Sequence, residues 1–151
     1  MRVAITRAIS SLIIATAFLV SAATSYADEW PLAAGDFWEV TGIDTKDGGE
    51  LKYAEWLATE WRKNTEFAKS KGWIKDVKIL YNQYPRQGEA DIYLIWIRES
   101  IPTGAEGEKR SQEFQEWKKK TIANMVGESG NRSEYREVLS SSLLQEAPFR
   151  D

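Results

Sequence analysis

The spacing of apolar and polar residues predicts a strand and then a helix in the first half of the chain. Residues 37–43 read Phe-Trp-Glu-Val-Thr-Gly-Ile, an aromatic and β-branched run that favours a strand. After a polar loop, apolar residues recur at the helical period; they are Leu51, Ala54, Leu57, Ala58, Trp61, Thr65 and Ala68. A second stripe of Tyr53, Trp56 and Phe67 widens the apolar side of this helix. Gly72 stands where a left-handed residue is expected to end it.

Two strands are predicted next, and the second is apolar on both faces. Residues 73–82 alternate between apolar and polar side chains, as a strand with one covered face does. Residues 83–90 form a turn-rich connection containing Pro85 and Gly88. Residues 91–99 form the third strand; Ile92, Leu94 and Trp96 line one face, and Tyr93, Ile95 and Ile97 line the other. We therefore expect both faces of the third strand to be buried.

The last part of the chain predicts a helix and a final strand. Residues 101–107 carry a proline and two glycines and are expected to form a loop. Residues 111–125 show a second helical stripe, which we expect residues 127–131 to interrupt. Ser133 is placed to cap a short helical turn over 135–138, and residues 139–145 form a modest fourth strand. The order predicts an α+β, ferredoxin-like βαββαβ sandwich, an antiparallel four-stranded sheet with two helices on one face.

Such a sheet has one face that its own helices do not cover. Because the third strand is apolar on both sides, we expect that open face to be covered as well. The simplest cover is the same face of a second copy, which gives a two-fold, sheet-to-sheet homodimer. A different protein is the alternative cover.

The chain resembles the dimeric α/β-barrel superfamily. The resemblance lies in the element order, the doubly apolar third strand, and the segment Tyr84-Pro85-Arg86 followed by Asp91-Ile92-Tyr93-Leu94. It spans residues 37–149 and implies two ferredoxin-like subunits packed sheet to sheet. It also implies a ligand site between each sheet and its own helices. Members of the superfamily include haem-dependent enzymes that degrade haem or chlorite, and cofactor-free monooxygenases that form quinones.

The first 27 residues have the pattern of a cleavable secretory signal. Arg2 and Arg7 supply the positive charge, residues 9–20 supply a short apolar stretch, and small residues precede a cleavage point between Ala27 and Asp28. The apolar stretch is shorter than a membrane-spanning helix requires, which disfavours the alternative of an uncleaved anchor. We therefore expect a periplasmic or secreted protein with one domain over 28–151 and no membrane anchor after cleavage.

The amino-acid composition excludes several kinds of catalytic and metal-binding site. The sequence contains no cysteine and no histidine, so it offers no thiolate nucleophile, no histidine base and no histidine ligand for haem or zinc. Residues 44–48 only faintly resemble a calcium loop and lack its required glutamate. The net charge of −3 argues against nucleic acid as a partner. We expect no cofactor and no metal.

The aromatic residues remain as the candidate functional feature. The chain has 7 Trp, 6 Tyr and 5 Phe, and flat apolar walls with a few polar groups suit a small aromatic ligand. The candidate ligand-binding residues are Trp38, Tyr53, Trp56, Asn82, Arg86, Trp96 and Arg98. Arg98 follows Trp96 on the same strand face and is suited to hold a carboxylate or phenolate. Large aromatics at these spacings also serve as ordinary core, and Trp61 and Trp117 lie on the core stripes.

Two functional hypotheses follow. The first is an exported homodimer that binds a small apolar or aromatic ligand or has a structural role. The alternative is a cofactor-free monooxygenase acting on a phenol or quinol, in which Asn82, Trp96 and Arg98 surround the substrate ring. Whether any catalysis takes place stays open at this stage.

Overall fold

The computed structural model describes residues 30–150, and all of its helices and strands fall in one compact unit, Pro31–Asp151. The predicted signal segment, with its cleavage point between Ala27 and Asp28, lies outside the described residues. Within 30–150 there is no helix with the length and apolar character needed to cross a bilayer. The elements in order are β1 (Phe37–Thr45), α1 (Glu50–Trp56), η1 (Leu57–Trp61), α2 (Arg62–Ser70), β2 (Asp76–Tyr81), β3 (Ile92–Arg98), α3 (Gly104–Lys118), α4 (Ile122–Asn131), η2 (Arg132–Glu134) and β4 (Arg136–Gln145).

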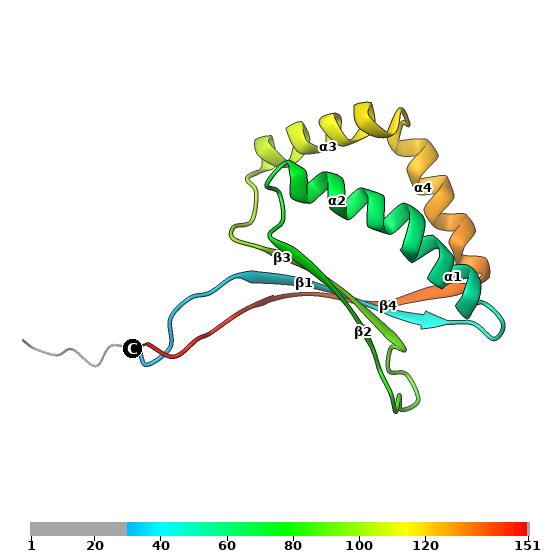
Figure 1. Ribbon diagram of the computed structural model, residues 1–151, viewed down its shortest axis with the longest axis horizontal. Helices are drawn as coiled ribbons and strands as arrows, with labels where there is room; N and C mark the ends of the chain where they lie inside the picture. Colours follow the sequence, from blue (N-terminus) through cyan, green and yellow to red (C-terminus); the bar gives the residue numbers. More distant parts are fainter. Residues whose placement is uncertain (1–29, 151) are drawn as a thin grey trace, which may run out of the picture. The chain divides into compact units, whose positions relative to one another are not determined.

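The strands form one antiparallel sheet in the order β2-β3-β1-β4. The helices lie together on one side of it (Figure 1). The architecture is thus α+β and consistent with a ferredoxin-like fold. In the β1–β3 ladder Glu39 is opposite Trp96 and Thr41 is opposite Leu94, so these four side chains share the helix-covered face.

The first helical region, residues 50–70, is continuous but contains a π-helical turn, η1. Tyr53 and Thr65 are 12 residues apart, so an uninterrupted α-helix would turn them about 120° away from each other. The extra residue in η1 restores the phase, and Tyr53, Leu57, Trp61 and Thr65 are all buried. The region ends at Gly72, whose φ of 68° confirms the expected left-handed residue.

The second helical region begins earlier than predicted and is divided in two. The Thr103 side chain accepts a hydrogen bond from the backbone N–H of Glu106 (3.3 Å), so α3 begins at Gly104 inside the predicted loop. Lys119 then adopts a φ of 53° and ends α3. A reciprocal capping box between Thr121 and Asn124 begins α4. The single helix predicted over 111–125 is therefore wrong.

Two further boundary predictions are corrected near the C-terminal strand. Residues 127–131, expected to interrupt the helix, form the second half of α4, because a glycine inside a helix costs only about 1 kcal/mol relative to alanine and does not by itself end it. The short helical turn lies at Arg132–Glu134 instead of 135–138. β4 consequently begins at Arg136, before the predicted start at Leu139, and a register shift opposite Gly42 and Ile43 accommodates the added length.

The core lies between the first helical region and the sheet. Its buried cluster consists of Ile43, Tyr53, Leu57, Trp61, Ile92 and Leu94. On the opposite face of β3, Ile95 and Ile97 are also buried, at 3% and 7% exposure. The prediction that both faces of the third strand are buried is confirmed.

Candidate functional site

A cavity of about 230 Å³ lies between the first helical region and the sheet. We call it the aromatic cavity, because three tryptophans and a tyrosine contribute to its lining. Its lining residues are Glu39, Thr41, Ile43, Tyr53, Trp56, Trp61, Leu94, Trp96, Arg136 and Val138. The residue added by η1 is what brings Trp61 to the same cavity as Tyr53.

Aromatic rings on the helix form one wall of the cavity. The rings of Tyr53 and Trp56 are stacked, with centroids 5.6 Å apart and planes 11° apart. The guanidinium carbon of Arg132 lies 4.3 Å from the centroid of the Trp56 ring, a close cation–π contact. The aromatic rings of this wall are therefore held in place, with a cation beside the Trp56 ring.

The sheet side supplies an ion pair at the edge of the cavity. Arg98 Nη2 donates a hydrogen bond to Glu39 Oε2 at 2.6 Å. The Arg98 side chain is 14% exposed and that of Glu39 is 45% exposed, so the carboxylate is the more solvent-exposed partner. The Arg98 guanidinium carbon also lies 5.8 Å from the Trp96 ring centroid. The Arg98 charge is thus already neutralised by Glu39, which lines the aromatic cavity.

Tyr53 is the most deeply buried ring of the cavity, at 1% exposure. Burial raises the pKa of its hydroxyl to about 12, although the positive charges of the nearby Arg136 and Arg132 partly lower that pKa. The hydroxyl therefore stays protonated across the physiological range. It can donate or accept a hydrogen bond to a ligand, but it does not act as a tyrosinate base.

A second cavity, of about 280 Å³, lies between α2, α3 and β3. Trp96 and Arg98 line it together with Trp73, Arg110 and Phe114. Because Trp96 lines both cavities, its indole ring stands between them.

The structure brings together only some of the residues that the sequence pointed to. Tyr53, Trp56 and Trp96 line the aromatic cavity, and Arg98 reaches its edge through Glu39. The other three candidates lie elsewhere. Trp38 is opposite Ile97 and is on the helix-free face, Asn82 lines a different pocket, and Arg86 lies in the exposed β2–β3 connection.

Three polar residues of the cavity were missed by the sequence analysis. Glu39 and Thr41 lie on β1, where two-residue alternation alone would have placed both on one face. The sequence pattern predicts a helical turn over 135–138, whereas Arg136 lies at the start of strand β4. A correct start for β4 would have placed it beside the aromatic residues.

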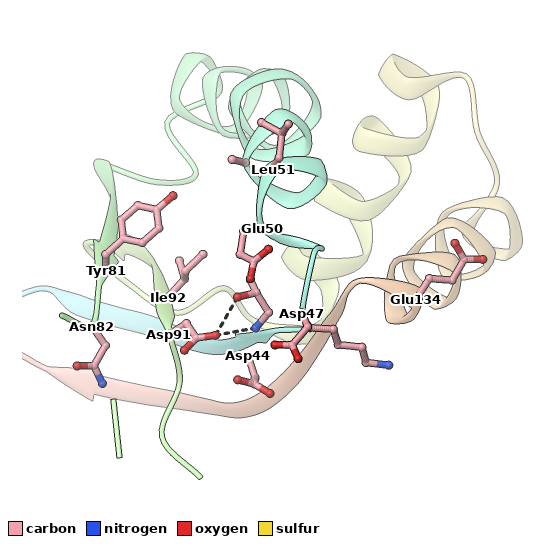
Figure 2. A pocket seen from close by; sticks show the side chains of 12 residues that line it. Asp44, Asp47, Glu50, Leu51, Tyr81, Asn82, Asp91, Ile92 and Glu134 are labelled. Atoms are coloured by element: carbon pink, nitrogen blue, oxygen red, sulfur yellow. Dashed lines mark hydrogen bonds between the residues drawn. The ribbon is translucent and has the colours of Figure 1, made fainter. Parts of the chain in front are cut away.

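A wider, open pocket of about 1140 Å³ lies where β1 meets α1 (Figure 2). Five carboxylates line it, those of Asp44, Asp47, Glu50, Asp91 and Glu134. The backbone N–H and the hydroxyl of Thr45 donate to Asp91 Oδ2 at 2.8 and 2.9 Å (dashed in Figure 2). The bond from the Thr45 backbone is the main cause of the low pKa of Asp91, whereas partial burial and the Asp91 charge raise the pKa of Asp44. Among residues 30–150, no group of three or more acidic side chains is arranged to hold a metal ion.

No protein-family model, curated protein or solved structure matches this chain. The aromatic cavity and the open acidic pocket are accordingly interpreted from their own residues.

Proposed function

We propose that the protein is an exported binding module that holds a small aromatic ligand in the aromatic cavity. The observation that carries this proposal is the cavity itself, between a stacked Tyr53–Trp56 wall and the Trp96 ring of the sheet. A volume of about 230 Å³ is below the usual range of drug-sized pockets, which favours one ring or two fused rings over a large cofactor.

The position of the cavity also supports the proposed membership in the dimeric α/β-barrel superfamily. In that superfamily ligands bind between the sheet and its own helices, and the aromatic cavity lies between α1, η1 and the sheet. The strand order β2-β3-β1-β4 is the order that the proposed ferredoxin-like subunit requires.

The same proposal includes a homodimer formed through the helix-free face of the sheet. That face carries a run of apolar side chains, namely Trp38, Val40, Leu80, Tyr93, Ile95, Ile97 and Leu144. Leu80 and Leu144 are 47% and 55% exposed in the single chain. Ile95 and Ile97 are already buried in the single chain, whereas water contact with Leu80 and Leu144 is unfavourable and pairing with an identical face removes it.

The monooxygenase hypothesis has less support from the geometry. It needs Asn82 beside Trp96 and Arg98, whereas Asn82 lines the acidic pocket and the other two line the cavity between α2 and α3. Oxygen uptake on a panel of quinols tests it directly. Sustained uptake that Arg98→Ala abolishes would replace the binding proposal with catalysis.

Calorimetric titration with 2-naphthamide, a neutral two-ring probe, tests the binding proposal. We expect one site per chain, and we expect Trp56→Leu to weaken binding about tenfold because it removes a stacked wall. Trp117→Leu is the matched control, since Trp117 is 40% exposed on α3 and does not line the aromatic cavity. Equal weakening by both variants, or no binding to the unmodified protein, would contradict the proposal.

A further inference from the structure

Arg136 is a buried cation beside the aromatic cavity. It begins β4, is 9% exposed and lines the cavity together with Tyr53. The one hydrogen bond of its side chain among the described residues is a long one, from Nη2 to the Ser129 hydroxyl at 3.3 Å. Its Nε is buried and has no hydrogen-bond partner within residues 30–150.

A second guanidinium, that of Arg132, lies close to the first. Its charge interacts with that of Arg136, and burial together with this repulsion lowers the pKa of Arg132. Arg132 packs on the Trp56 ring at 4.3 Å and donates to the Glu128 carbonyl oxygen at 3.1 Å. Its Nε is likewise buried with no partner in the described chain. Two cations thus lie next to the stacked aromatic wall.

No carboxylate in residues 30–150 forms an ion pair with either arginine. Glu39, the acidic residue of the cavity, is held by Arg98 at 2.6 Å. Of the acids next to Arg132 in sequence, Glu128 is held by Lys120 at 2.6 Å and Glu134 pairs with Lys52 at 3.5 Å. The cavity therefore has a surplus of positive charge on the side where Arg136 lies.

A buried guanidinium without an anionic partner is unfavourable, because it has left water without a compensating charge. A bound anion removes this penalty through charge-assisted hydrogen bonds. Arg136 differs in this respect from Arg98, because Glu39 of the same chain neutralises the Arg98 charge. The positive charge at Arg136 is suited to bind an anionic group of a ligand.

We propose that the ligand of the aromatic cavity is an aromatic carboxylate, whose ring packs beside Tyr53 and Trp56 and whose carboxylate accepts hydrogen bonds from Arg136. This inference rests on the proposed function, since it names the ligand class of the same cavity. Arg132 is close enough to add attraction without direct contact. A carboxylate fits because its planar pair of oxygens matches the planar guanidinium.

The test compares two ligands of nearly equal shape by calorimetry, 2-naphthoate and its neutral amide, 2-naphthamide. We expect the unmodified protein to bind 2-naphthoate at least about tenfold more tightly than 2-naphthamide. We expect this preference to weaken as salt rises, because part of it is an interaction between charges.

Arg136→Gln then assigns the preference to one side chain. We expect this variant to bind both ligands equally, at the affinity that the unmodified protein has for the amide. Arg62→Gln is the control, since it removes the same charge from the exposed surface of α2, where Arg62 pairs with Glu66. If circular dichroism shows that Arg136→Gln is unfolded, Arg136→Lys retains the charge and is expected to retain a reduced preference for the acid.

The outcomes separate the two proposals. Equal binding of acid and amide by the unmodified protein overturns the carboxylate inference and leaves the aromatic cavity as a site. A preference for the acid that survives in folded Arg136→Gln also overturns the inference, because the anion then binds elsewhere. Absence of binding by both ligands overturns the proposed function and this inference together.

Discussion

At the scale of single residues, the two arginines at the aromatic cavity differ in how their charge is neutralised. Arg98 has Glu39 at 2.6 Å, whereas Arg136 has no acidic partner within the described chain. The first therefore stabilises the fold through an ion pair within the chain. The second is proposed to gain its partner from a ligand.

Glu39→Gln is expected to destabilise the fold by about 1–2 kcal/mol, because Arg98 is 14% exposed and loses its anion. The exposure of Glu39 keeps the effect below that of a fully buried pair. Urea unfolding followed by circular dichroism measures the change. Glu66→Gln is the control, because its pair with Arg62 is 59–72% exposed and is expected to contribute less than about 0.5 kcal/mol. Equal losses of stability in the two variants would show that the Glu39–Arg98 pair contributes no more than an exposed surface ion pair.

Asp91 gives a pH dependence with a defined sign. Its folded pKa lies below the ordinary value, mainly because the Thr45 backbone N–H donates to its carboxylate. A carboxyl with a lowered folded pKa stabilises the fold above about pH 4, and this contribution is lost as pH falls through the folded pKa. We expect Asp91→Asn to lower stability by about 1 kcal/mol at pH 7.

Thermal unfolding of Asp91→Asn and the unmodified protein between pH 2 and pH 7 measures this effect. The difference between their melting temperatures is expected to shrink at the acidic end. Asp47→Asn, an exposed aspartate of the same acidic pocket, serves as the control. A difference that grows toward low pH would have the wrong sign for a carboxylate stabilised by the hydrogen bonds from Thr45.

At the scale of elements, the first helical region depends on the π-helical turn. Tyr53, Leu57, Trp61 and Thr65 follow each other at intervals of four, and only an added residue keeps all four buried. Insertion of one alanine after Thr59, an exposed residue of η1, rotates the residues beyond it by about a further 100° and is expected to turn part of this set away from the sheet. The expected loss is about 2–4 kcal/mol, the range for losing a large side chain from a core.

Urea unfolding of the insertion variant, with Thr59→Ala for comparison, checks this prediction. Thr59→Ala keeps the residue count and is expected to change stability by less than about 1 kcal/mol. Nearly unchanged stability in the insertion variant would mean that the burial of these four residues does not depend on the phase of the helix.

The elements also show what the sequence could predict. The strand predicted at 37–43, which the structure extends to Thr45, and the doubly buried β3 were predictable, because runs of β-branched and aromatic residues are typical of buried strands. The predicted boundaries of the α3–α4 region were wrong. Two cap residues, Thr103 and Thr121, determine where its helices begin, whereas the glycines of α4 had indicated a break. Local cap geometry outweighed the propensity of the glycines.

The candidate site was predictable only in part, for a related reason. Tyr53, Trp56 and Trp96 follow from periodicity, since each repeats on a predicted apolar face. Arg136 does not, because its place depends on where β4 begins and on which strand lies beside it. The separation of Trp38 from the cavity is likewise set by the register of β1 against β3.

At the scale of the whole molecule, the proposed dimer makes the helix-free face a buried surface. The double variant Leu80→Lys, Leu144→Lys places charges on that face and is expected to give single chains. Leu51→Lys is the control, because Leu51 is 71% exposed on α1 and is not part of the face. Light scattering after size separation measures the mass. A single-chain mass for the unmodified protein would exclude the homodimer and favour a different partner.

The central claim is that the aromatic cavity is a ligand site, and nuclear magnetic resonance of the indole N–H groups tests it most directly. During titration with 2-naphthamide, we expect signals of Trp56, Trp61 and Trp96 to shift, because these rings line the cavity. We expect Trp38, on the opposite face, and Trp117, on α3, to stay in place. Shifts confined to Trp38 or Trp117, or no shift at all, would contradict the account.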